Sequence, residues 1–252
     1  MKIKILLAST ALAAGVAFAG AAQAGEVNVM SWGGAYTKSQ VEAYHKPWMA
    51  KTGNKVNSID SPNPATPIKA QVEAGNVTID VADVEFSDAV RLCDEGLLER
   101  IDASKLPAAP DGTSAAKDFI DGALTDCAVA NIVWSTIYAY DSSKVKGSAP
   151  TTMADFFNTK KYPGKRGLRK TAKANLEMAL IADGVATGDV YKLLNTDGGV
   201  ARAFKKLDSI KNDVVWWEAG AQAPQLLADG EVVMTTAYNG RIFGAAVGEG
   251  KP

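Results

Sequence analysis

The sequence predicts an α/β protein whose sheets contain parallel strands. Strand-like and helical patterns alternate along the first hundred residues after the leader, and a long β-branched run follows at Asn131–Tyr140. The 252 residues are 47% hydrophobic and 22% charged, close to the average of globular proteins. Long disordered regions are therefore not expected.

The first 24 residues are predicted to be a cleaved signal peptide. Lys2 and Lys4 precede the apolar run Ile5–Ala19, and small residues at 22–24 form a cleavage site before Gly25. The apolar run is shorter than the roughly 20 residues that span a bilayer, which favours a signal over an anchor. We therefore expect an exported protein.

The first part of the mature chain alternates strands with helices. Glu26–Ser31 alternates polar and apolar residues and reads as an opening strand. Thr37–Gln40 resembles a capping box at the start of a helix that reaches Gly53. The other predicted elements here are strands at Lys55–Ile59 and Asp80–Val84 and helices at Pro67–Gly75 and Ser87–Gly96.

The second part opens with Asn131–Tyr140, which has no breaker and suits a crossing from one lobe to another. Gly244–Pro252 has the composition of a loop, and the chain reads as a fragment whose C-terminal part is absent. The predicted elements between them are strands at Gly167–Arg169, Val214–Trp217 and Val232–Tyr238, and helices at Thr151–Phe157, Ala174–Gly184 and Ala221–Leu227, with two more inside Gly188–Ile210.

The two cysteines, Cys93 and Cys127, are predicted to form a disulfide, because an even pair in an exported chain usually does. The alternative is a catalytic thiol. That chemistry needs a histidine base, and His45 is the only histidine. We expect His45 to be an exposed or partly packed helix residue.

Composition and motifs argue against several functions. Lys and Arg number 27 against 28 Asp and Glu, which does not indicate nucleic-acid binding. One histidine and two cysteines fall short of the usual four zinc ligands, so neither a metal nor a cofactor is expected. Phosphate-loop, dinucleotide-binding and nucleophile-elbow motifs are absent from the sequence. We expect no enzyme, with an exported α/β hydrolase as the alternative from another class.

Aromatic and polar residues recur where predicted strands end. Ligands of open α/β sheets bind beyond the carboxyl ends of the strands, so these residues predict a binding cleft. The glycines after Trp32 would let backbone approach a ligand closely. The candidate ligand-binding residues are Trp32, Gly34, Tyr36, Glu85, Phe86, Ser87, Trp217, Glu218, Tyr238, Asn239 and Arg241.

Three runs, VMSWGGAYTKSQ at 29–40, DVADVEFSDAVRLCDEG at 80–96 and GEVVMTTAYNGRIF at 230–243, resemble the spermidine/putrescine-binding family of periplasmic solute receptors of ABC importers. The resemblance covers residues 26–252. It implies a two-lobed type II periplasmic-binding-protein fold with a hinge, with lobe 1 at 25–135 and the hinge crossing and lobe 2 at 136–252. It also implies that about the last third of a normal chain is missing, so we expect this chain alone to bind poorly or misfold.

The resemblance further implies a non-enzymatic periplasmic receptor, monomeric, that closes on a small solute and delivers it to an inner-membrane ABC permease. A chemoreceptor is the alternative partner. Trp32 and Tyr36 match the family's first ligand loop, and Tyr238 stands where polyamine receptors usually have a tryptophan.

Arg241 departs from the family pattern, which often has an aspartate there to hold an ammonium group. A polyamine needs carboxylates and aromatic faces, whereas a guanidinium suits a carboxylate. A polyamine is the first prediction, and a carboxylate-bearing ligand held by Arg241 is the alternative. The cation-rich stretch Lys160–Lys173 is predicted to be a solvated face.

Overall fold

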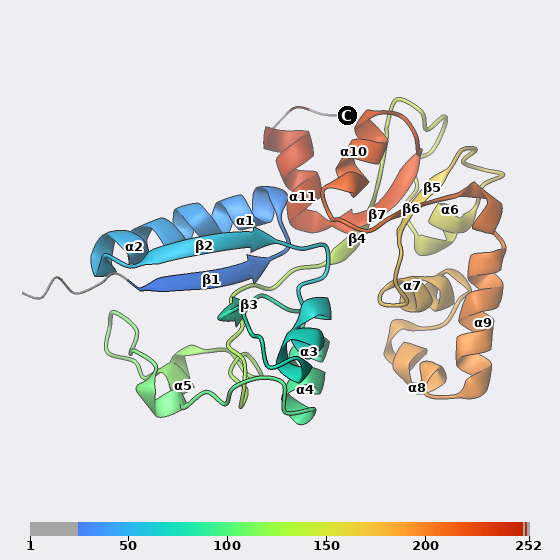
Figure 1. Cartoon of the computed structure of the whole chain (residues 1–252). Helices are drawn as coiled ribbons and strands as arrows, with labels where there is room; N and C mark the ends of the chain where they lie inside the picture. Colours follow the sequence, from blue (N-terminus) through green and yellow to red (C-terminus); the bar gives the residue numbers. More distant parts are fainter. Residues whose placement is uncertain (1–24, 249, 251–252) are drawn as a thin grey trace, which may run out of the picture.

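The computed structural model describes residues 25–248 and 250 and contains two lobes (Figure 1). The predicted signal peptide lies outside the described residues. Lobe 1 holds a three-stranded sheet in the order β2-β1-β3, and lobe 2 holds a four-stranded sheet in the order β4-β7-β5-β6. Within the described ranges, no helix has the length and apolar character needed to cross a membrane. The two-lobed α/β prediction is confirmed.

Lobe 1 is built around β1 (Glu26–Ser31), which pairs in parallel with β2 (Lys55–Asp60) along its whole length and with β3 (Val81–Ala82) over two residues. The helices of this lobe are α1 (Gly34–Gln40), the π-helical turn η1 (Val41–His45), α2 (Lys46–Thr52), α3 (Thr66–Glu73), α4 (Phe86–Asp94), η2 (Ala103–Lys105) and α5 (Ala115–Asp118). A small core joins α3 and α4 through Ile68 and Leu92.

The first helix begins at Gly34 rather than at Thr37, so the predicted capping box is wrong. Gly33 has a φ of 72°, which lets the chain leave β1 and turn directly into α1. The hydroxyl of Thr37 instead lies inside the helix and accepts from the backbone N–H of Gly33 at 2.9 Å. The first ligand loop is therefore short and closely tied to the helix that follows it.

Lobe 2 contains one antiparallel pair and two parallel pairs. β4 (Thr136–Tyr140) runs antiparallel to β7 (Met234–Tyr238), and β5 (Arg166–Arg169) lies between β7 and β6 (Val214–Trp217), parallel to both. Its helices are α6 (Met153–Phe157), α7 (Asn175–Ala182), η3 (Thr187–Asp189), α8 (Val190–Leu194), α9 (Asp197–Asp208), η4 (Lys211–Asp213), α10 (Gln222–Ala228), α11 (Asn239–Phe243) and η5 (Gly244–Gly248).

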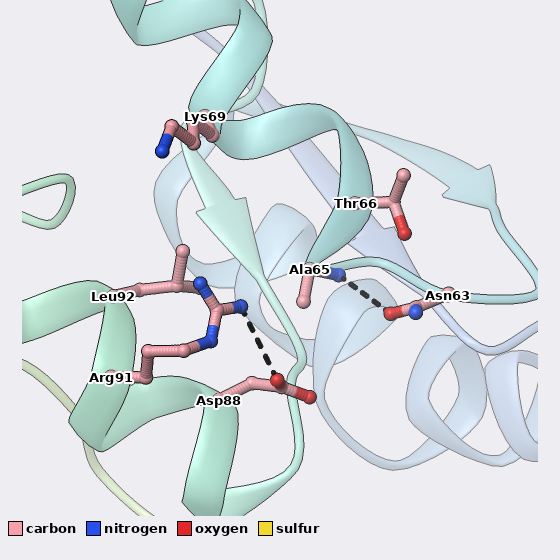
Figure 2. Close-up of a pocket in the computed structure, with 7 residues that line it drawn as sticks. All are labelled: Asn63, Ala65, Thr66, Lys69, Asp88, Arg91 and Leu92. Atoms are coloured by element: carbon pink, nitrogen blue, oxygen red, sulfur yellow. Dashed lines mark hydrogen bonds and ion pairs between the residues drawn. The ribbon is translucent and has the colours of Figure 1, made fainter. Parts of the chain in front are cut away.

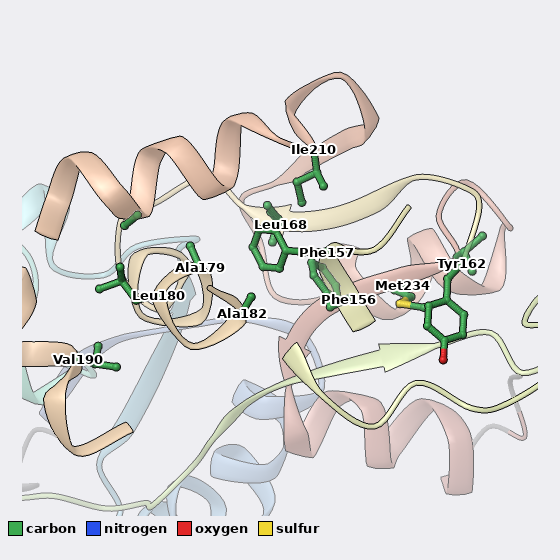
Figure 3. Packing of buried hydrophobic residues seen from close by; sticks show 12 residues of the cluster. Phe156, Phe157, Tyr162, Leu168, Ala179, Leu180, Ala182, Val190, Ile210 and Met234 are labelled. Atoms are coloured by element: carbon green, nitrogen blue, oxygen red, sulfur yellow. The ribbon is translucent and has the colours of Figure 1, made fainter. Parts of the chain in front are cut away.

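The largest of the three hydrophobic cores within the described residues lies in lobe 2, between the sheet and helices α6, α7, α8 and α9 (Figure 3). Phe156, Leu168, Leu180 and Met234 are fully buried there. Burying an aliphatic or aromatic side chain of this size stabilises the fold by about 1.5–3 kcal/mol each. This core fixes β5 and β7, the strands whose ends carry the candidate site.

Several predicted elements have different bounds in the structure, and β3 covers only Val81–Ala82 of the predicted Asp80–Val84. Asn131–Tyr140 is a strand only from Thr136, because residues 131–135 are exposed and pair with no strand among the described residues. Gly244–Gly248 forms a π-helical turn that continues α11, where a loop was predicted. The predicted lobe boundary between 135 and 136 stays a prediction.

The disulfide prediction is confirmed, and the prediction for His45 is wrong. Cys93 and Cys127 form the predicted disulfide, which ties the end of α4 to the segment that leads toward the crossing. His45 is buried rather than exposed or partly packed, and its Nδ1 lies 3.1 Å from the hydroxyl of Ser58 on β2. This contact places the imidazole ring of His45 against β2.

Candidate functional site

Arg169 lies at the centre of the contacts between the two lobes. It is the last residue of β5, and its guanidinium carbon lies 5.3 Å from the ring centroid of Trp32 in lobe 1 and 5.7 Å from that of Tyr238 in lobe 2. Its Nη1 donates to Glu85 Oε1 at 2.9 Å, and the two side chains are only 14% and 12% exposed. A largely desolvated guanidinium that faces two aromatic rings is strongly held in place.

Sequence reasoning did not single out Arg169, because it placed the whole stretch Lys160–Lys173 on a solvated face. That prediction is wrong for Arg166, which is fully buried and donates to the backbone carbonyls of Phe156, Gly164 and Tyr162. It is wrong for Arg169 as well. The signal that could have found Arg169 is its position at the carboxyl end of a parallel strand.

Lobe 1 contributes acids to this contact and lobe 2 contributes cations. Lys173 donates to Glu85 Oε2 and to Asp88 Oδ2, both at 2.7 Å. Burial lowers the pKa of Lys173, but the hydrogen bonds to Asp88 and Glu85 outweigh it and hold the pKa above its ordinary value. Glu85 therefore accepts from two lobe-2 cations at once and joins the lobes electrostatically.

Arg241 makes a second link between the lobes. It lies in α11, beside the start of α1 (Figure 1), and only 8% of it is exposed. Its Nη2 donates to the backbone carbonyls of Trp32 and Gly33 at 2.9 and 3.0 Å. Burial lowers the pKa of the guanidinium. Arg241 thus fastens lobe 2 to the first ligand loop, and its role as a carboxylate anchor stays a prediction.

Two glycines make room for the Arg241 side chain. A Cβ at Gly34 would lie 2.9 Å from Arg241 Nη1, and a Cβ at Gly220 would lie 2.7 Å from Arg241 Nε and 2.8 Å from a ring carbon of Tyr238. Contacts this short are not tolerated without movement of the arginine. Gly34 was predicted to let a ligand come close to the backbone. In the structure, its missing side chain leaves space for the guanidinium of Arg241.

Aromatic rings surround the hydroxyphenyl group of Tyr238. Its ring stands edge-on to Trp217, with centroids 5.7 Å apart, and edge-on to Trp134, with centroids 5.0 Å apart. Burial raises the pKa of Tyr238 to about 12, so the phenol is neutral. Trp134 was left out of the candidate residues because it was interpreted as a tryptophan that fills a core, whereas 41% of it is exposed. These rings form an aromatic cluster beside Arg169.

The other predicted site residues lie apart from this cluster. Phe86 is 62% exposed, Ser87 is exposed, and Glu218 pairs in solvent with Lys170 at 3.1 Å. Asn239 accepts from the backbone N–H of Ser135, a bond across the crossing segment. Tyr36 donates to Asn131 Oδ1 at 3.3 Å within lobe 1. Their contacts with a ligand remain predictions.

A separate cavity of about 180 Å³ lies between α3 and α4 (Figure 2). Asp88 is one of its lining residues and accepts there from Arg91 at 3.4 Å, while its other oxygen accepts from Lys173. The cavity belongs to lobe 1 and is distinct from the interlobe cluster. No group of three or more His, Cys, Asp or Glu side chains suited to a metal occurs in the part of the chain that the structure describes.

A family model described as bacterial extracellular solute-binding protein matches residues 43–252. The chain belongs to this solute-binding family. The earlier resemblance to periplasmic solute receptors is thereby confirmed at the level of the family.

Individual proteins of known ligand are also similar to this chain. A gamma-aminobutyric acid-binding protein of Pseudomonas aeruginosa is 49% identical over 233 residues. The periplasmic binding protein MotA from A. tumefaciens B6, solved in complex with glucopine, is 34% identical with a TM-score of 0.81 and is matched over 90% of this chain. The Atu4243 GABA receptor is 36% identical with a TM-score of 0.71, again over 90% of this chain.

The solute-binding chain spans only part of the length of these relatives. The match to the Pseudomonas protein covers 92% of this chain and 64% of that protein, whereas the matches to MotA and the Atu4243 receptor cover 90% of this chain and 67% and 66% of those proteins. The ligands named for these three proteins are not polyamines, so the polyamine specificity predicted from the sequence finds no support among them.

Proposed function

We propose that this protein is the periplasmic substrate-binding receptor of an ABC importer and that it captures a small carboxylate-bearing solute between its lobes. Membership of the solute-binding family supports the receptor role, and the GABA and glucopine named for its relatives support the ligand class. The receptor performs no chemistry. It presents the bound solute to a membrane permease.

The position of Arg169 between the lobes, paired with a carboxylate, is the observation that supports a carboxylate-bearing ligand. A guanidinium binds a carboxylate through two parallel hydrogen bonds, and Arg169 already holds the carboxylate of Glu85 between the lobes. A ligand carboxylate can take the place of Glu85 on the same guanidinium, with the rings of Trp32 and Tyr238 on either side.

A polyamine fits this cleft poorly. Lobe 2 brings Arg169, Lys173 and Arg241 to the interlobe contacts, and a ligand made only of ammonium groups adds more positive charge beside them. A desolvated ammonium needs a carboxylate partner, and Glu85 and Asp88 already pair with lobe-2 cations. The carboxylate alternative is therefore better supported than the polyamine prediction.

The exported-hydrolase alternative lacks a histidine base among the described residues that join the lobes. His45 is buried in lobe 1, and the described hydrogen bonds pair its ring with Ser58 only. A triad would need that ring to face a nucleophile and an acid within reach of the substrate.

Ligand capture follows from the two lobes and the crossing between them. A solute that contacts both lobes binds the closed arrangement more tightly than the open one, and so shifts the equilibrium toward closure. A carboxylate on Arg169 of lobe 2 with its carbon chain against Trp32 of lobe 1 makes contacts of this kind.

The test is calorimetric titration of the purified full chain with γ-aminobutyrate and with putrescine. The resemblance implies weakened binding by this chain alone, so the expected result is that γ-aminobutyrate binds more tightly than putrescine, and failure of both to bind would contradict the proposal. Arg169→Gln should weaken γ-aminobutyrate by about 30-fold or more, because removing one partner of a buried charge pair costs roughly 2 kcal/mol or more. Arg202→Gln is the matched control, because Arg202 pairs with Asp183 in solvent within lobe 2. Putrescine binding that survives Arg169→Gln would overturn the carboxylate proposal.

A further inference from the structure

A second polar cluster lies at the carboxyl end of the lobe-1 sheet, and the contacts of Arg169 do not use it. Asp83 directly follows β3, and its Oδ2 accepts from the hydroxyl of Ser31 at 3.2 Å and from Nε2 of Gln40 at 2.7 Å. Within the described residues, the structure gives Asp83 neither an ion pair with a lysine or arginine nor a hydrogen bond to Oδ1. It is a half-buried carboxylate without a cation.

Gln40 adds an acceptor that has no donor. The residue is 3% exposed, its Nε2 is committed to Asp83, and its Oε1 is buried with no hydrogen-bond partner among the described residues. The amide orientation is fixed, because a carboxylate accepts only from the NH₂ side. A buried acceptor left unpaired is costly, so this oxygen favours a donor from a ligand or from the neighbouring hydroxyl of Tyr44.

Tyr36 closes the cluster on the side of α1. Its hydroxyl donates to Asn131, and burial together with the charge of Asp83 raises the pKa of the phenol well above its ordinary value. The ring therefore stays neutral and presents an aromatic edge and an oxygen beside the carboxylate. Acceptors and an aromatic group around one uncompensated charge are the surroundings that a cation requires.

We propose that Asp83 and Gln40 receive a primary ammonium group of the ligand. An ammonium carries three donors and one positive charge, which match Asp83 Oδ1, Gln40 Oε1 and the charge that lacks a partner. A divalent metal is disfavoured, because calcium takes six to eight oxygen ligands and commonly several carboxylates, and this cluster has one. The inference rests on the proposed function, since it supplies the second pole of the same ligand.

The backbone sets the distance between the two poles. Asp83 and Glu85 are separated by Val84, which packs against the core of lobe 1, so their Cα atoms lie up to about 7 Å apart. A carboxylate that replaces Glu85 on Arg169 and an ammonium on Asp83 are therefore several bonds apart. This spacing selects an ω-amino carboxylate over an α-amino acid, whose two charged groups share one carbon.

Three ligands test the inference on the unmodified full chain by calorimetric titration. We expect γ-aminobutyrate to bind at least about tenfold more tightly than butyrate, which lacks the amine, because a hydrogen bond to a charged group is worth a factor of this size or more. α-Aminobutyrate should also bind at least about tenfold more weakly, because its amine falls short of Asp83.

Asp83→Asn tests the residue directly. It should reduce γ-aminobutyrate affinity to the level of butyrate and leave butyrate binding unchanged, whereas Asp94→Asn, an exposed residue on α4 of the same lobe, should change neither. Equal binding of γ-aminobutyrate and butyrate by the unmodified chain would overturn the ammonium site and leave the carboxylate receptor intact. Binding of γ-aminobutyrate that Arg169→Gln leaves unchanged would remove the proposed function, and the ammonium site with it. The ligand series keeps the test decisive if Asp83→Asn fails to fold.

Discussion

His45 is the residue through which mild acid acts on the stability of lobe 1. It is the only histidine, it is buried against β2, and burial lowers its pKa below the ordinary value of 6.5. Above pH 6.5 the ring is neutral in both the folded and the unfolded chain. As the pH falls below 6.5 the unfolded chain takes up the proton first, so the free energy of unfolding falls until the folded-state pKa is passed.

The prediction is a loss of stability between pH 7 and pH 5 that His45→Asn removes in part. One proton taken up only by the unfolded chain gives a slope of at most about 1.4 kcal/mol per pH unit. Asparagine keeps a polar atom near the position of Nδ1 and so can still reach Ser58. Denaturant unfolding at several pH values measures the slope. Identical slopes for the two proteins would show that carboxylates alone cause the acid effect.

The sequence predicted which residues gather at the candidate site better than it predicted the hydrogen bonds and ion pairs that they make there. Trp32, Tyr238 and Arg241 stand at strand ends, and this placement alone predicted that they would meet. That Arg241 donates to the carbonyls of Trp32 and Gly33 depends on the relative position of two lobes, which local patterns do not encode. Arg169 was missed for the same reason, because its partner Glu85 lies 84 residues away.

Helix α9 depends on one of two adjacent glycines. Thr196 caps this helix by accepting from the N–H of Gly199, and a Cβ at Gly199 would overlap the carbonyl oxygen of Leu193 at the end of α8. A Cβ at Gly198 would meet nothing within 4 Å. The close approach of α8 to α9 is therefore possible only with glycine at 199.

The two glycines make a matched pair of variants. Gly199→Ala should lower the free energy of unfolding by about 1–3 kcal/mol, as overpacking usually does. Gly198→Ala should leave it unchanged or raise it by up to about 1 kcal/mol, because alanine is the better helix former. Chemical denaturation of both variants measures the difference. Equal stabilities would mean that α8 moves away without cost.

At the scale of elements, segments with a local signal were predicted well and segments that depend on a neighbour were not. β1 and β6 have their predicted bounds, and α3 lies within two residues of its predicted bounds, because alternation, β-branching and a proline at the first turn act locally. Residues 131–135 have equally strong strand character, but no strand lies beside them within the described residues, and Val133 is 81% exposed. A strand needs a pairing partner, which composition cannot supply.

The whole molecule is held in its present arrangement by two kinds of link between the lobes. One is the ion-pair network of Glu85 and Asp88 with Arg169 and Lys173. The other is the pair of hydrogen bonds from Arg241 to backbone carbonyls of the first ligand loop. The ion pairs respond to salt and to the charge of a ligand, whereas the backbone acceptors of Arg241 cannot change their charge.

Small-angle X-ray scattering of the full chain without ligand separates these two links. Glu85→Gln combined with Asp88→Asn removes the acids, and loss of about 2 kcal/mol of pairing would shift the equilibrium between closed and open lobes roughly 30-fold toward open. The radius of gyration should rise. High salt should cause part of the same change in the unmodified chain, because the Debye length falls to about 3 Å at 1 M.

Glu218→Gln with Asp208→Asn is the control, because those acids pair with lysines inside lobe 2. A radius of gyration that stays constant in the Glu85 and Asp88 variant would mean that Arg241 alone holds the lobes together, and Arg241→Met should then be the substitution that opens them.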